Sequence, residues 1–158
     1  MHITQSVKRN AQLFPNKIAT AYGDRSYTWK ESLDRISKLA AGIKNLNVSS
    51  NDRVAILSHN SDRYFEFLYA CSWSGAVFVP INTRLAPPEI QFWINDSESK
   101  VLFVDDNFSQ VVEDLLKENK IPSVKNVVYL SDDSCPDGMI KFDELISSEI
   151  LEDAMKGN

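Results

Sequence analysis

The chain has 158 residues, of which 43% are hydrophobic and 25% are charged, and its formal net charge is −5. This length fits one domain with a real core, and no apolar run is long enough to span a membrane. The 17 basic residues are scattered along the chain, which argues against nucleic acid as the main partner. The polar amino terminus predicts no secretory signal peptide, so we expect a cytoplasmic protein with Cys71 and Cys135 as reduced thiols.

The first elements predicted along the chain are a short helix, a β-hairpin and a capped helix. Gly23 and Asp24 separate two short extended runs, and this spacing is typical of a hairpin. Thr28 and Glu31 then match the capping box, in which each of the two side chains accepts a hydrogen bond from the backbone N–H of the other residue. A helix should therefore begin after Thr28. The expected bounds are 4–14 for the first helix and 18–22 and 25–28 for the two strands.

From residue 53 onward, short apolar runs alternate with helical patterns. We expect connections that are short and crossovers that are right-handed, which gives a doubly wound α/β fold. Its sheet should be mainly parallel, with flanking helices and the small N-terminal β-hairpin beside it. Residues 1–147 form the expected domain, and 148–158 form a weakly patterned tail. The expected strands are 54–57, 76–79, 101–104 and 126–130, and the expected helices are 62–73, 88–95, 108–119 and 142–146.

The run 75–85 is the most informative stretch of the sequence. Gly75 should end a helix, the strand 76–79 should be buried on both faces, and Pro80 should stop its ladder because proline has no N–H to donate. The carboxyl end of the strand then carries three polar residues. Open α/β sheets bind ligands at this edge. The three residues are Asn82, Thr83 and Arg84.

The same run identifies a family by resemblance. It reads Gly-Ala-Val-Phe-Val-Pro-Ile-Asn-Thr-Arg-Leu, with Glu89 and Ile90 behind it. This closely resembles the second core region of adenylate-forming enzymes, the family of acyl-CoA synthetases, amino-acid adenylating domains and luciferases. The likeness extends from about residue 18 to about residue 130. We interpret the chain as the N-terminal part of an acyl-CoA synthetase of the fatty-acid or aryl-acid CoA ligase type.

The resemblance implies a two-step reaction for the full enzyme. A carboxylic acid attacks ATP to give an acyl adenylate and pyrophosphate, with Mg²⁺ neutralising phosphate charge, and the thiol of CoA then displaces AMP. The family's nucleotide loop and catalytic lysine lie downstream of the matched region, and the sequence stops before them. The five glycines are also too far apart to form a phosphate-binding loop. We therefore expect this chain alone to be inactive and to bind ATP, Mg²⁺ and CoA only weakly.

Arg84 is the first candidate for a functional residue. A guanidinium at the carboxyl edge of a strand can hold a phosphate or a carboxylate in a fork. The resemblance implies contact with a phosphate of CoA. The alternative is a surface arginine that pairs with Glu89 and fixes the next turn. No catalytic residue and no metal ligand is assigned.

The other candidates each have a structural interpretation that we favour. Asn82 and Thr83 should bond neighbouring backbone groups of their turn. His59 and Asn60 follow a buried strand, where binding groups often lie, but a lone histidine is more often a loop residue. Asp105 and Asp106 could ligate Mg²⁺, although acidic residues before a helix usually complement its dipole. Aromatic side chains at helical spacing usually belong to the core, and this is the interpretation we favour for Trp73 and Trp93. The serines of 131–134 have no neighbouring base, so we do not expect a nucleophile among them.

Two other functional classes remain open from the sequence. A stand-alone α/β binding or interaction module would keep the fold without the enzyme, and it should expose no large apolar patch. A nucleotide-binding fold of the flavodoxin kind also fits the alternation of strands and helices, but no phosphate loop is recognisable. A fragment of a synthetase should instead expose an apolar face, centred on the helix 62–73, and self-associate through it.

Overall fold

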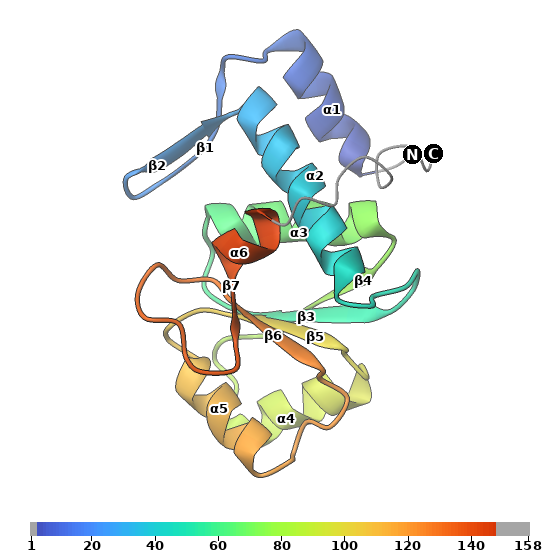
Figure 1. Ribbon diagram of the computed structural model, residues 1–158, viewed down its shortest axis with the longest axis vertical. Coiled ribbons are helices and arrows are strands. Elements are labelled where there is room, and N and C mark those ends of the chain that lie inside the picture. Colours follow the sequence, from blue (N-terminus) through green and yellow to red (C-terminus); the bar gives the residue numbers. More distant parts are fainter. Residues whose placement is uncertain (1–2, 148–158) are drawn as a thin grey trace.

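The computed structural model describes residues 3–147, and a five-stranded parallel sheet lies at its centre (Figure 1). The strand order is β4-β3-β5-β6-β7, so the chain moves outward in one direction, returns past its first strand and continues on the other side. This is the flavodoxin-like order of doubly wound folds. The predicted α/β fold is therefore confirmed. The strands are β3 (Arg53–Leu57), β4 (Val77–Pro80), β5 (Val101–Val104), β6 (Asn126–Tyr129) and β7 (Ile140–Lys141).

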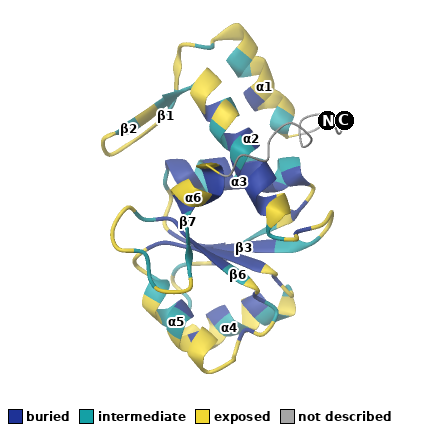
Figure 2. Cartoon of the chain, viewed as in Figure 1, coloured by how far each residue is buried: buried dark blue, intermediate teal, exposed yellow. Residues whose placement is uncertain are grey.

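Helices cover both faces of the sheet, which divides the core into two clusters. One cluster joins alternate strand residues such as Ile56 and Phe103 to α2, α3 and α6, and the other joins Leu57 and Val104 to α4 and α5 (Figure 1). Figure 2 shows the central strands as the most deeply buried part of the molecule. The helices are α1 (Thr4–Leu13), α2 (Trp29–Asn45), α3 (Asp62–Ser74), α4 (Pro87–Asp96), α5 (Ser109–Lys117) and α6 (Phe142–Ser147). Among the helices of residues 3–147, none combines the length and apolar character that crossing a bilayer requires.

The hairpin and the capping box form as the sequence predicts. Strands β1 (Ile18–Tyr22) and β2 (Arg25–Thr28) pair antiparallel with the predicted bounds. The Glu31 carboxylate accepts from the Thr28 backbone N–H at 2.8 Å, and Thr28 Oγ1 accepts from the Glu31 N–H at 3.3 Å. The hydrogen bond from the Thr28 backbone lowers the pKa of Glu31 below its usual value. The capping box thus gives two backbone donors at the start of α2 their partners.

Strand β4 differs from its predicted environment. It is the edge strand of the sheet, and Val77 is 46% exposed, so the strand is not buried on both faces. Pro80 does not stop the ladder either, because it pairs with Ile56 and the next N–H, of Ile81, donates to the Ile56 carbonyl at 2.9 Å. Backbone groups alternate in direction along a strand, so the proline nitrogen faces the open edge. A proline costs no ladder hydrogen bond there, and it removes one docking point for a further strand.

Strand β7 was not expected from the sequence. It has only two residues, Ile140 and Lys141, which pair in parallel with Val128 and Tyr129 of β6. A pair this short carries no alternation that could reveal it. The predicted polar loop after β6 therefore returns to the sheet before α6 begins. The predicted tail 148–158 lies outside the described residues.

Helix α3 lies between α2 and the sheet, as its apolar sequence predicts. Its buried face nevertheless includes charge, because the side chains of Asp62 and Glu66 are each only 1% exposed. Glu66 accepts from Arg35 of α2 at 2.5 and 3.1 Å, and burial raises its pKa despite that partner. The prediction that this helix carries an exposed apolar face is wrong. The most exposed large hydrophobic side chains of the described chain lie on other elements.

Candidate functional site

The carboxyl ends of β3, β5 and β6 surround a crevice of 230 Å³. The crevice lies at the point where the strand order reverses, between β3 and β5, which is the usual ligand position in doubly wound folds. Three loops and the tip of the hairpin supply its walls. Residues from these segments are Ser58, His59 and Ser61; Asp105 and Asn107; Leu130, Ser131 and Asp132; and Tyr22 and Arg25.

Asp105 joins the loops that follow β3 and β5. Its Oδ2 accepts from the backbone N–H of His59 at 2.8 Å and from the hydroxyl of Ser58 at 3.1 Å. Its Oδ1 accepts from the backbone N–H of Asn107 at 3.0 Å. The side chain is buried and both oxygens have donors, so its position fixes the floor of the crevice. The sequence placed both His59 and Asp105 at strand ends but did not predict that they meet.

Asp106 makes a second loop contact, with Ser131 after β6. Ser131 Oγ donates to Asp106 Oδ1 at 2.8 Å and accepts from the Asp106 backbone N–H at 2.9 Å. The two aspartates thus point to different partners instead of converging on one ion. No cluster of three or more potential metal ligands occurs within residues 3–147. The contacts described for Asp105, Asp106 and Ser131 join loops of the domain to one another, which favours a structural role for all three.

His59 and Asn60 are exposed at the mouth of the crevice. The His59 ring lies against Phe108, with 5.2 Å between ring centroids, so the imidazole is held at the surface by an aromatic contact. Ser61 behind them caps α3, because its Oγ accepts from the Tyr64 N–H at 3.1 Å. This loop is therefore well ordered by local contacts. It presents an imidazole and an amide to solvent.

The hairpin reaches the crevice through Arg25. Its guanidinium binds both carboxylate oxygens of Asp62, at 2.8 Å each, and also pairs with Asp132. Arg63, buried beside it, donates to the Leu130 carbonyl and to Asp132 at 2.7 Å. Partial burial acts to raise the pKa of Asp132, but the hydrogen bonds and charges of the two arginines hold this pKa below its usual value. Sequence analysis missed this network because its members are far apart in the chain.

The run 75–85 takes the turn structure that its residues favour. Gly75 has a φ of 83°, a left-handed conformation that ends α3 and favours glycine. After β4, Asn82 Oδ1 accepts from the Arg84 N–H at 2.9 Å, and the Leu85 N–H donates to the Asn82 carbonyl at 3.3 Å. The predicted local role of Asn82 is confirmed. Thr83 is half-buried within the same turn.

Arg84 projects from this turn as an exposed side chain. Within the described part of the chain, its guanidinium forms no hydrogen bond or ion pair. Glu89, the alternative partner, is used elsewhere, because its carboxylate accepts from the Ala86 N–H at 2.8 Å at the start of α4. The pairing of Arg84 with Glu89 is therefore not formed. A role for Arg84 in binding a ligand stays a prediction.

The remaining candidates lie away from the crevice. Trp93 is 48% exposed on α4, next to Phe92, and does not belong to the core as the structural interpretation assumed. Trp73 is half-buried, with Lys8 Nζ 4.4 Å from its ring centroid. Cys71 is buried in α3, and neither cysteine forms a disulfide.

Comparison with known proteins identifies the family that the sequence suggested. The model of the AMP-binding enzyme family matches residues 7–154. The chain belongs to this family. The matched range includes the whole described sheet and the loops at its carboxyl edge.

Curated relatives and solved structures extend the comparison. A peroxisomal butyrate–CoA ligase of Arabidopsis thaliana is 36% identical over 111 residues, which cover 70% of this chain and 19% of the ligase. A feruloyl-CoA synthase of Amycolatopsis is 33% identical over 137 residues, covering 87% of this chain and 28% of the synthase. The N-terminal domain of FACL13 from Mycobacterium tuberculosis superposes with a TM-score of 0.81 at 27% identity, covering 96% of this chain and 37% of that one. The matched part of the chain spans between 19% and 28% of the length of these two curated relatives.

Proposed function

We propose that this chain provides the N-terminal α/β layer of an AMP-forming acid–CoA ligase. The full reaction joins a carboxylic acid to CoA through an acyl adenylate, with release of pyrophosphate and AMP. The observation that carries the proposal is the family match over residues 7–154, which includes the edge strand β4 and the exposed Arg84 after it. Relatives named for butyrate, ferulate and benzoate support a carboxylic acid of the fatty or aryl class.

The described residues fit one part of this chemistry and not another. ATP and Mg²⁺ need clustered backbone donors and free carboxylates, but the crevice offers no glycine-rich loop and its aspartates are hydrogen-bonded to the loops. CoA needs a cation for its phosphates, and Arg84 is exposed and free of partners among residues 3–147. We therefore assign to this chain the holding of a CoA phosphate. Adenylation is assigned to segments that it does not contain.

The first test is pyrophosphate release by the purified 158-residue protein. ATP, Mg²⁺ and CoA are supplied together with a panel of butyrate, longer fatty acids, benzoate and ferulate. We expect no release above the blank without acid, because no phosphate-binding loop is present. Acid-dependent release by this protein would contradict the proposed division of labour. Release by a longer form of the chain that includes a Ser/Thr/Gly-rich loop, in the same assay, would support it.

The second test addresses Arg84 through amide chemical shifts during titration with CoA. We expect weak binding, with dissociation constants of about 1 mM, and shifts centred on the turn after β4. Arg84→Ala should weaken binding about tenfold, which corresponds to one charge-assisted hydrogen bond. Pantetheine, which lacks the phosphates, should cause no shifts there. Lys125→Ala is the matched control, because Lys125 is a basic exposed residue directly before β6, at the amino-terminal ends of the parallel strands and so on the far side from Arg84. Equal losses in both variants would remove Arg84 from the proposed site.

A further inference from the structure

Exposed apolar side chains gather at the amino-terminal end of the molecule. Nine large hydrophobic side chains are exposed among residues 3–147, and five of them belong to the segment from Ile3 to Tyr22. Helix α1 and the hairpin carry this segment at one end of the long axis, whereas α4 lies at the other end (Figure 1). The five are Ile3, Leu13, Phe14, Ile18 and Tyr22.

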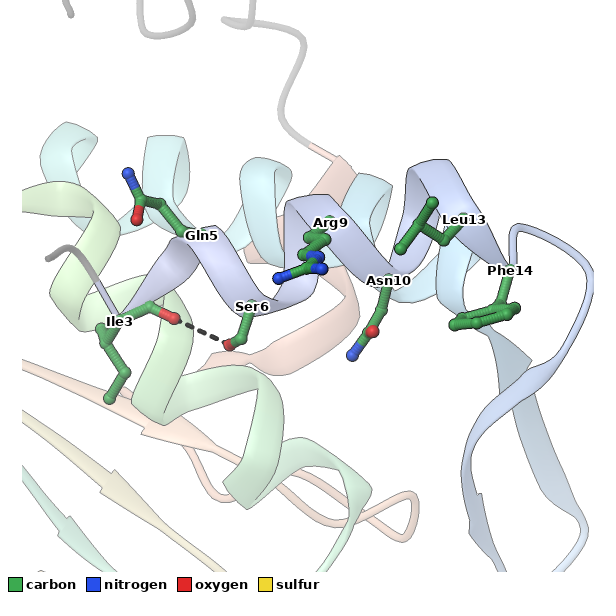
Figure 3. Close-up of a pocket in the computed structure, with 7 residues that line it drawn as sticks. All are labelled: Ile3, Gln5, Ser6, Arg9, Asn10, Leu13 and Phe14. Carbon is green, nitrogen blue, oxygen red and sulfur yellow. Dashed lines mark hydrogen bonds between the residues drawn. The ribbon is translucent and has the colours of Figure 1, made fainter.

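Three of these side chains belong to a single helix and its flanks. Ile3, Leu13 and Phe14 are 53%, 56% and 43% exposed, and they line a hollow of 790 Å³ along α1 (Figure 3). Small polar side chains, Ser6 and Asn10, lie between them on the same side. Val7 of the same helix is fully buried in the core. Val7 thus holds α1 on the domain, whereas the outer side of the helix, defined here by the hollow, carries the exposed Ile3, Leu13 and Phe14 among polar side chains.

Charge is segregated in the same segment. Residues 1–23 contain three basic residues and no acidic residue, whereas all 22 acidic residues lie beyond them. Two of the cations adjoin the apolar face, since Arg9 lines the same hollow and Lys17 Nζ lies 4.6 Å from the centroid of the Phe14 ring. A protein of net charge −5 therefore has one cationic segment without acidic residues. The same segment carries most of the exposed large hydrophobic side chains.

We propose that the outer side of α1 docks on a bilayer surface that contains anionic phospholipid. Interfacial helices combine apolar side chains, which enter the boundary between headgroups and acyl chains, with flanking Lys or Arg that attract anionic headgroups. Here Leu13 and Phe14 would enter the boundary, and Arg9 and Lys17 would meet the headgroups. A second copy fits this face less well, because a two-fold contact would bring the same cations together. The inference does not depend on the proposed CoA ligase function.

The test is cosedimentation of the 158-residue protein with vesicles. Vesicles of phosphatidylcholine with about one third phosphatidylserine are compared with vesicles of phosphatidylcholine alone, and we expect at least about tenfold tighter binding to the former. Binding should fall as salt is raised, because the headgroup charge is screened. The double variant Leu13→Asp with Phe14→Asp should lose binding. Both side chains are exposed, so the variant should fold, which circular dichroism checks.

The matched control is the double variant Phe92→Asp with Trp93→Asp on α4. These side chains are 61% and 48% exposed and lie at the other end of the molecule, so this variant should bind vesicles as the parent does. Loss of binding in this control, or equal binding to neutral and anionic vesicles, would overturn the proposal. It would also be overturned if sedimentation showed a dimer that Leu13→Asp dissociates while vesicles bind no protein.

Discussion

Replacing Asp62 with asparagine is expected to lower the free energy of unfolding by about 2 to 3 kcal/mol. The Asp62 side chain is 1% exposed and accepts two hydrogen bonds from Arg25, whose own side chain is 24% exposed. The substitution keeps the shape of the side chain but leaves a partly buried guanidinium facing a neutral amide. Arg25 retains Asp132, and solvent reaches one side of it, so we place the loss below that of a fully buried pair.

Chemical denaturation followed by circular dichroism measures this change. The matched control is Glu98→Gln, since Glu98 also pairs with an arginine, Arg53, but is 76% exposed. We expect this control to cost less than about 1 kcal/mol. Equal losses in the two variants would mean that burial does not decide the strength of these ion pairs. The position of the hairpin on α3 would then depend on other contacts.

Local features of this fold could be predicted from the sequence because each is specified by neighbouring residues. The Gly23-Asp24 turn, the capping box at Thr28 and the left-handed end of α3 at Gly75 all involve residues a few positions apart. The alternation of apolar runs was sufficient for the doubly wound sheet. These signals depend on backbone geometry and on local hydrogen bonds.

Features that depend on residues distant in sequence could not be predicted in this way. Nothing in the run 76–80 indicates that its strand lies at the sheet edge, because its apolar sequence fits a central strand equally well. The exposed Val77 shows the difference. The two residues of β7 form a strand only because β6 offers them partners. The partners of Arg25 likewise lie 37 and 107 positions away.

The same limit applies to the candidate site. His59, Asp105 and Arg84 could each be placed at the carboxyl edge of the sheet from strand positions alone. Their partners could not, and the partners decide their roles. Asp105 is occupied by backbone and hydroxyl donors of the neighbouring loop, which favours a structural role. Arg84 has no such partner among the described residues, which is why it keeps a proposed ligand.

Replacing Gly42 with valine is expected to lower the free energy of unfolding by about 2 to 3 kcal/mol and to loosen α6 in particular. Gly42 lies inside α2, one turn before its end, where a glycine weakens the helix unless another element approaches closely. A Cβ built on Gly42 would lie 2.7 Å from the Leu145 carbonyl oxygen and 2.7 Å from Leu145 Cγ. The carbonyl belongs to the backbone, so a rotamer change cannot relieve the overlap. Helix α6 must move away from α2.

Hydrogen exchange locates the damage, and denaturation measures its size. Amides of α6 and β7 should lose protection in Gly42→Val, while those of β3 and β5 at the centre of the sheet should keep it. The control is Lys44→Val on the same helix, because Lys44 is exposed and a valine there meets no neighbour. That change should cost about 0.5 kcal/mol through helix propensity alone. Full protection of α6 in Gly42→Val would contradict this prediction. It would show that the two helices accommodate the valine without opening, and that the glycine is not required for their close packing.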